Sequence, residues 1–137
     1  MEAVNITIKY EPAATTREFG HYILSFTGLE GTQYSVKLKF GFDELRSIAQ
    51  DTSSIAFDFL VFSLSVYNAD RVISRALYSE EGWCRRMRLS VPVLHLSEMN
   101  NSKETLTSAL NFLTGDDWEL NFKQAEPYLI DQELLLV

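Results

Sequence analysis

Five arginines gathered in about 18 positions form the most distinctive chemical group in this chain. A guanidinium group binds phosphate or carboxylate oxygens through a planar fork of N–H donors. The grouping therefore predicts one of two things: a site for a polyanion or an acidic partner, or ion pairs with Asp70, Glu80 and Glu81 at a solvated surface. We favour the ion pairs, and keep the first alternative open. The five residues are Arg71, Arg75, Arg85, Arg86 and Arg88.

Part of this group lies at the end of a long apolar segment, "DFLVFSLSVYNADRVISR", which covers residues 58–75. The segment predicts a helix over about 54–76 that is apolar nearly all round until Tyr67, and that is therefore covered on most sides. Asp70 and Arg71 follow at its polar end. We interpret them as a structural docking group, which holds the next loop or a neighbouring domain, in preference to a reactive site.

Acidic and imidazole side chains give little support to catalysis. Asp58 and Asp70 lie about three helical turns apart, too far to share a metal ion, and a two-metal nuclease needs several converging carboxylates. His21 and His95 are the only histidines, and neither stands in a nucleophile motif, so both are interpreted as surface or satisfied side chains. The chain also contains none of the glycine motifs that bind nucleotide phosphates. These patterns predict that this chain alone is not an enzyme and has no metal or cofactor.

Composition and charge describe a single folded domain. The chain has 137 residues, 46% of them hydrophobic, and a net charge of −7. That charge makes nonspecific binding of nucleic acid unfavourable, although it leaves room for a local basic patch. The single cysteine, Cys84, excludes an internal disulfide and suits a reducing cytosol. The apolar run over 55–69 is shorter than the roughly 20 residues that cross a bilayer, so we expect a cytoplasmic protein with no membrane partner.

Hydrophobic periodicity predicts an α+β fold with the order β-β-β-α-β-α-β. The sheet is expected to be mainly antiparallel and packed by the long central helix and a second helix. This order is also that of a ribonuclease H-like arrangement, which is an analogy of order alone. We expect one domain over 1–125, and a tail or the start of a following strand over 126–137. The expected strands cover 4–10, 20–27, 34–40, 83–94 and 118–123, and the expected helices 42–50 (optional), 54–76 and about 101–115.

Two local signals mark the second helix and the strand before it. Asn101 and Glu104 resemble a capping box at the helix start, and Gly115 is a natural stop. Trp83 and Trp118 are large apolar anchors, expected to pack together or at an interface.

Three motifs together resemble a known family. "VFSLSVYNADRVISR", "EGWCRRMRLSVPV" and "LNFLTGDDWELNF" follow one another over about 58–123, more than half of the domain. In this combination they resemble the region that precedes the PP-loop in QueC-like proteins of bacterial anti-phage defence islands, relatives of 7-cyano-7-deazaguanine synthase. The positions that match are Tyr67, Ala69, Asp70, Arg71, Gly82, Trp83, Arg85, Leu113, Thr114, Gly115, Asp116, Trp118, Leu120 and Phe122.

The resemblance does not extend to the family's catalytic loop. The ATP-handling sequence S-G-G-x-D-S is absent, and "DQELLLV" is similar to the buried strand that precedes it. The resemblance therefore implies an accessory region that cannot adenylate a substrate by itself. The family's catalytic residues have no counterpart here.

We expect, on this basis, a noncatalytic accessory or docking domain associated with a QueC-like PP-loop ATPase in anti-phage defence, which positions a protein or nucleotide substrate. Its partner is a PP-loop ATPase domain or chain, or another protein of the defence operon, and a nucleic-acid partner is not favoured. The alternative is a nucleic-acid-binding module with a ribonuclease H-like core lacking metal ligands, whose binding would weaken steeply with salt. The expected binding residues are Asp70, Arg71, Arg75, Trp83, Arg85, Arg86 and Arg88.

Overall fold

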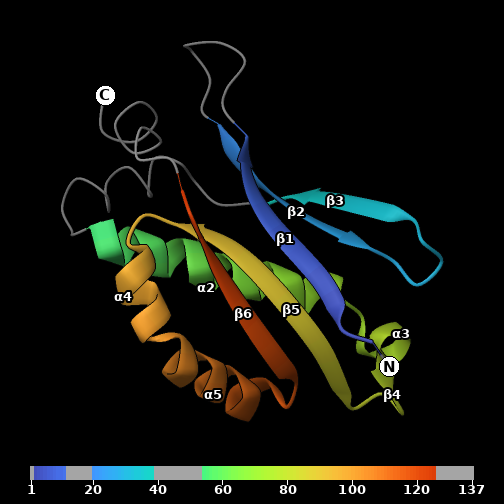
Figure 1. Cartoon of the computed structure of the whole chain (residues 1–137). Coiled ribbons are helices and arrows are strands. Elements are labelled where there is room, and N and C mark those ends of the chain that lie inside the picture. Colours follow the sequence, from blue (N-terminus) through green and yellow to red (C-terminus); the bar gives the residue numbers. More distant parts are fainter. Residues whose placement is uncertain (1, 12–19, 39–53, 126–137) are drawn as a thin grey trace.

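The computed structural model describes residues 2–11, 20–38 and 54–125, and its α+β architecture confirms the predicted fold class (Figure 1). Within these residues, six strands form one mixed sheet and four helices pack against it. The strands are β1 (Val4–Glu11), β2 (His21–Thr27), β3 (Gln33–Lys37), β4 (Ser79–Glu80), β5 (Cys84–Val93) and β6 (Asp117–Gln124). The helices are α2 (Ser54–Val72), α3 (Arg75–Tyr78), α4 (Leu96–Asn101) and α5 (Lys103–Thr114).

Strand β5 lies in the middle of the sheet and takes part in both of the parallel pairings found between the described strands. It runs parallel to β1 on one side and to β6 on the other, and its first residues pair antiparallel with the short β4. Strands β1, β2 and β3 form an antiparallel meander. The sheet is thus mixed, where the sequence predicted a mainly antiparallel one, because the crossovers through α2 and through α4–α5 return the chain in the direction of β1.

All the described helices cover the same face of the sheet. The inward side chains of β1, β2, β5 and β6 form one buried cluster with residues from α2 and α4, and Leu106 and Leu110 of α5 pack against it. Alternation in β5 is strict, since Met87, Leu89 and Val91 are at most 1% exposed while the residues between them point to the other side. The described helices do not cover the other side of the sheet, from which the outward side chains of the strands project. We call that side the open face.

The long helix differs from its prediction at its end and on its outer side. It ends at Val72, and a separate turn of helix, α3, begins at Arg75. Phe59 and Tyr67 are 51% and 56% exposed, so α2 is buried along one side and not on most sides as expected. No helix among the described residues is both long and apolar enough to cross a membrane. The optional helix over 42–50 lies outside the described residues.

The second predicted helix, over about 101–115, corresponds to α5, and a short helix that the sequence did not predict, α4, precedes it. Asn101 is the last residue of α4, and α5 follows after Ser102, whose backbone N–H bonds the carbonyls of Glu98 and Met99. The predicted capping box of Asn101 and Glu104 is therefore wrong, because the chain runs from one helix into the next without an extended N-cap, and Ser102 makes no side-chain cap. Gly115 ends α5 with φ of 74°, as its sequence position predicts.

Candidate functional site

A buried arginine is the centre of the most highly connected polar group in the structure. Arg85 points inward from β5 and is 1% exposed. Its Nη2 donates to Oδ2 of Asp116 at 2.6 Å, and its backbone N–H donates to the other carboxylate oxygen at 2.9 Å. Further donations reach the Asp70 carboxylate and the backbone carbonyls of Asp70 and Ile73. Each donor on this side chain thus has an acceptor, which a buried charge requires.

A second arginine reaches the same aspartate from α3. Arg75 donates to Oδ1 and Oδ2 of Asp116 at 2.6 and 2.9 Å. It also donates to the carbonyls of Trp83, at 2.8 Å, and Thr114, at 2.9 Å. We call Asp70, Arg75, Arg85 and Asp116 the arginine hub. It ties together the end of α2, α3, the start of β5 and the start of β6.

The electrostatics of the hub keep Arg85 and Asp116 charged. Burial raises the pKa of Asp116, but hydrogen bonds from Arg85 and Arg75 outweigh that effect and hold the pKa below its usual value. Burial lowers the pKa of Arg85, and the bonds to Asp116 and Asp70 reverse that, so its pKa lies above the usual value. Neither group is poised to transfer a proton near neutral pH. The hub is a structural tie and does not have the properties of an acid–base pair.

The structure divides the predicted arginine group into three settings. Arg75 and Arg85 meet in the hub together with Asp70. Arg71 lies on the exposed side of α2, with its guanidinium 5.4 Å from the ring centroid of Tyr67. Arg86 and Arg88 point to the open face, where their nitrogens approach the carboxylates of β6 at 3.7 and 2.7 Å. Of the acids expected to pair with these arginines, Asp70 does so in the hub; the other arginine ion pairs described involve Asp116, Asp117 and Glu119.

Asp116 is the hub residue whose role sequence reasoning missed, because it stood out from the sequence only as one of the positions that carry the motif resemblance. A signal was present in the strand periodicity. Asp116 is two positions before Trp118, and Arg85 two positions before Met87, so both charges belong to the buried faces of their strands. In the parallel register of β5 and β6, Arg86 pairs with Asp117. The residue before each of them, Arg85 in one strand and Asp116 in the other segment, is therefore next to the other.

Next to the hub, several apolar side chains are exposed. Trp83 is 77% exposed, Leu77 60% and Leu113 76%. Because one guanidinium binds the carbonyls of both Trp83 and Thr114, the turn before β5 and the end of α5 lie close together. We call Leu77, Trp83 and Leu113 the exposed corner. Trp118 is 2% exposed, so the two tryptophans do not share an environment.

The turn that carries Trp83 has an unusual backbone. Glu81 and Gly82 adopt φ of 59° and 78°, and the N–H of Trp83 donates to the carbonyl of Glu80 at 3.3 Å. A glutamate at positive φ is strained relative to glycine. The turn directs Trp83 away from the core at the beginning of β5.

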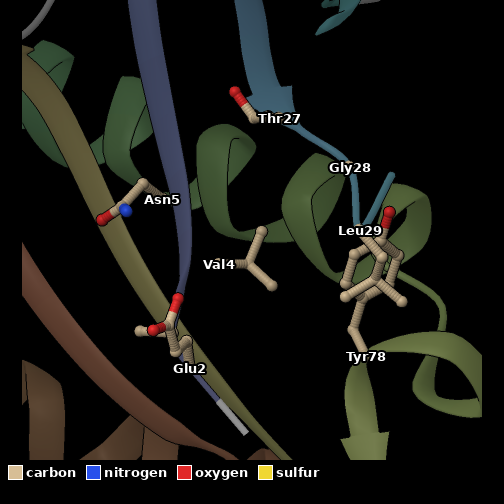
Figure 2. Close-up of a pocket in the computed structure, with 8 residues that line it drawn as sticks. Glu2, Val4, Asn5, Thr27, Gly28, Leu29 and Tyr78 are labelled. Atoms are coloured by element: carbon tan, nitrogen blue, oxygen red, sulfur yellow. The ribbon is translucent and has the colours of Figure 1, made fainter. Parts of the chain in front are cut away.

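Two hollows lie on either side of Tyr78. One, of about 470 Å³, is bordered by the exposed corner and is lined by Glu80, Glu81, Trp83, Cys84 and Arg86 as well as the tyrosine. The other, of about 290 Å³, lies between the start of β1 and the segment after β2 (Figure 2). Leu29 and Tyr78 form one side of it, and Glu2 is its only ionisable carboxylate among the lining residues. In the first hollow the Cys84 thiol donates to the backbone carbonyl of Arg85.

Asp58, the other acid considered from the sequence, has a local structural role. Its carboxylate accepts the backbone N–H groups of Leu94 and His95, both at 2.7 Å, and lies 3.2 Å from Nδ1 of His95. These contacts join α2 to the start of α4. In the described ranges, no three His, Cys, Asp or Glu side chains gather in a way that could hold a metal ion.

Comparison of the chain with family models, with curated proteins and with solved structures finds no match. The geometry above is therefore the basis for the assignments that follow, together with the motif resemblance described from the sequence.

Proposed function

We propose that this chain is a noncatalytic docking domain of anti-phage defence, which associates with a QueC-like PP-loop ATPase and positions that enzyme's protein or nucleotide substrate. The motif resemblance supports the choice of partner. The observation that supports docking is the exposed corner, where a tryptophan at 77% exposure stands beside other uncovered apolar side chains. Large exposed aromatic and aliphatic side chains of this kind are typical anchors of protein interfaces.

The arginine hub supports this proposal because it fixes the corner before any partner binds. Arg75 bonds the backbone on both sides of the corner, at Trp83 and at Thr114. A pre-organised surface loses less conformational entropy on association, so more of the contact energy appears as affinity. Asp70, Arg75 and Arg85 are therefore assigned as positioning residues, and Trp83 as the contact residue. Arg71 and Arg86 lie in the outer part of the same end of the molecule and are assigned to its polar rim.

Titration calorimetry of the purified chain with a QueC-like PP-loop ATPase tests the proposal. We expect micromolar or tighter binding that changes little between low and moderate salt. Trp83→Ala is expected to weaken it by about tenfold or more, the effect of losing an interface anchor. Phe59→Ala is the matched control, because Phe59 is an exposed aromatic residue near the other end of α2. Absence of binding, or equal loss in both variants, would contradict the proposal.

A further inference from the structure

Charge is distributed unevenly between the open face and the rest of the molecule. The outward positions of the five long strands carry five basic and three acidic side chains, a net charge of +2, whereas all 137 residues together carry −7. The open face is therefore the basic side of an acidic protein. Its charged residues are Lys9, Lys37, Arg86, Arg88, Lys123, Glu11, Asp117 and Glu119.

The acids on this face are already paired. Asp117 lies beside Arg86 and Glu119 binds Arg88, while Glu11 approaches His21 at 3.5 Å. The three lysines take part in none of the ion pairs found among the residues that the structure describes. The positive charge available to a partner on this face is therefore that of the lysines.

These lysines lie in one row across the sheet. Lys9 pairs with Ile23, which pairs with Lys37, and Lys123 pairs with Pro92 of β5. The β1–β5 pairs end at Thr7 with Ser90, so Lys9 and Pro92 each lie two residues beyond the last pair. Lys9 and Lys37 are two strands apart, or about 9–10 Å, and Lys123 lies toward the same end of the sheet. The row is at the end of β5 opposite to Trp83, away from the exposed corner.

A second row, next to the lysines, consists of small hydrogen-bonding side chains. Its members follow the register across all five strands: Asn121, Ser90, Thr7, Ser25 and Ser35. Lysine together with serine, threonine and asparagine is the set of side chains that contacts phosphate and sugar oxygens in nucleic-acid complexes. An acidic peptide would bind to the lysines alone, and the row of small hydrogen-bonding side chains would make no specific contact with it.

The part of the open face that the described strands form presents no aromatic side chain, which favours one form of nucleic acid. Its outward positions in the described strands include no Phe, Tyr or Trp. Proteins that hold single strands depend on stacking of bases on aromatic rings. In a duplex the bases are stacked on one another, and binding can rely on backbone contacts. We propose that the open face is a binding site for the phosphate backbone of double-stranded nucleic acid, with Lys9, Lys37 and Lys123 as its cationic contacts.

Fluorescence anisotropy with labelled mixed-sequence DNA and RNA duplexes tests this site. We expect a Kd between roughly 1 and 100 µM at low salt. Three phosphate contacts predict a slope of log affinity against log salt of about −2.7, or roughly a 40-fold loss between about 50 and 200 mM salt. Comparison of the DNA and RNA arms identifies which duplex is preferred, and preference for either is compatible with backbone recognition.

The matched variants separate the lysine row from general charge. The triple variant Lys9→Gln, Lys37→Gln, Lys123→Gln should lose about tenfold or more in affinity, and each single variant should reduce the salt slope by about 1. Lys103→Gln, in α5 on the helical side, removes the same charge from another surface and should bind as the unaltered chain does. Circular dichroism of each variant verifies that it is folded.

Three results would overturn the proposal. They are no duplex binding at low salt, unchanged binding by the folded lysine variants, and equal or tighter binding of a single-stranded oligonucleotide or of polyglutamate. The docking proposal is tested separately, since Trp83→Ala should leave duplex binding unchanged and the lysine variants should leave binding to the ATPase unchanged.

Discussion

The two faces of β5 place the same residue type in opposite physical situations. Arg85 points to the helices, and its side chain is 1% exposed. Arg88, three positions later, points to the open face, and its side chain is 47% exposed. Arg85 pairs at 2.6 Å with Asp116, the residue just before β6, and Arg88 pairs at 2.7 Å with Glu119 of β6. Distance alone therefore does not distinguish the two pairs, and solvent exposure does.

Solvent exposure thus decides whether an arginine of this strand holds chain segments together or belongs to the surface. An exposed ion pair stays in contact with water, which screens the attraction between its charges, so it contributes little to stability. A buried pair has lost its water, so removal of one partner leaves the other charge uncompensated. The inward pair therefore helps to specify how the four chain segments of the hub meet, whereas the outward pair contributes mainly to surface charge.

The largest expected effect is that of removing the buried acid. Asp116→Ala leaves the guanidinium groups of Arg85 and Arg75 without their shared carboxylate, and should lower the free energy of unfolding by about 3–5 kcal/mol. Asp117→Ala is the control, because Asp117 is also an aspartate but is exposed on the open face. This variant should lower the free energy of unfolding by at most about 1 kcal/mol. Urea denaturation followed by tryptophan fluorescence measures both. Similar losses for the two variants would remove the distinction between the faces.

A smaller effect is expected at Asp58, a buried acid for which no arginine partner is found among the residues that the structure describes. Asp58→Ala leaves the backbone N–H groups of Leu94 and His95 without their acceptor, and should cost about 2 kcal/mol. Glu98→Ala, in the first turn of α4 but exposed, should change the free energy of unfolding by less than about 0.5 kcal/mol. Thermal and urea unfolding of the two variants compare them. An Asp58→Ala loss as large as that of Asp116→Ala would show that arginine pairing is not what makes a buried acid important here.

The pH dependence of stability tests the charge state of the hub. Since the pKa of Asp116 is lower in the folded chain than in the unfolded one, its stabilising contribution is complete above the unfolded value of about 3.9 and is lost as the pH falls through the folded value. The stability difference between the unaltered chain and Asp116→Asn should therefore shrink below about pH 4. Urea unfolding at a series of pH values measures this difference. A difference that grows on acidification would contradict the assignment.

The smallest effect is expected for the outward pair. A double-mutant cycle on Arg88→Gln and Glu119→Gln should give a coupling energy of about 0.2–1 kcal/mol, which decreases as salt is added. Arg88 also donates to the Asn5 side chain at 3.1 Å, so Asn5→Ala controls for that bond. A coupling of several kcal/mol would mean that the open face is covered by something that excludes water.

Much of the fold followed from the sequence because alternation is a local property. The strands that begin the chain, the faces of β5, the stop at Gly115 and the α+β class are all expressed in patterns of a few residues. The direction of β6 and the parallel pairings of β5 depend on how crossovers return over the sheet, and no short pattern encodes them. Helix α4 was missed because six residues are too few to display an amphipathic period.

The candidate site was predictable in its members and not in its arrangement. The arginines and Asp70 stood out by type and spacing, but their partners come from positions as distant as Asp116, which is 41 residues from Arg75 and 31 from Arg85. Such a pairing requires the strand register, which a single sequence does not contain. The exposure of Trp83 was likewise beyond reach, because a tryptophan at the start of a strand is as compatible with a core as with a surface.

The position of Asp116 near the end of the described fold has a consequence for biosynthesis. During translation, Arg75 and Arg85 leave the ribosome well before the residue that neutralises them both. Until then the Asp70 carboxylate is the only acid of the hub that Arg85 and Arg75 can meet, so the completed hub depends on the segment that leads into β6. A nascent or truncated chain that lacks that strand should stay open at this end, where a protease would find the segment around Arg75 and Arg85 accessible.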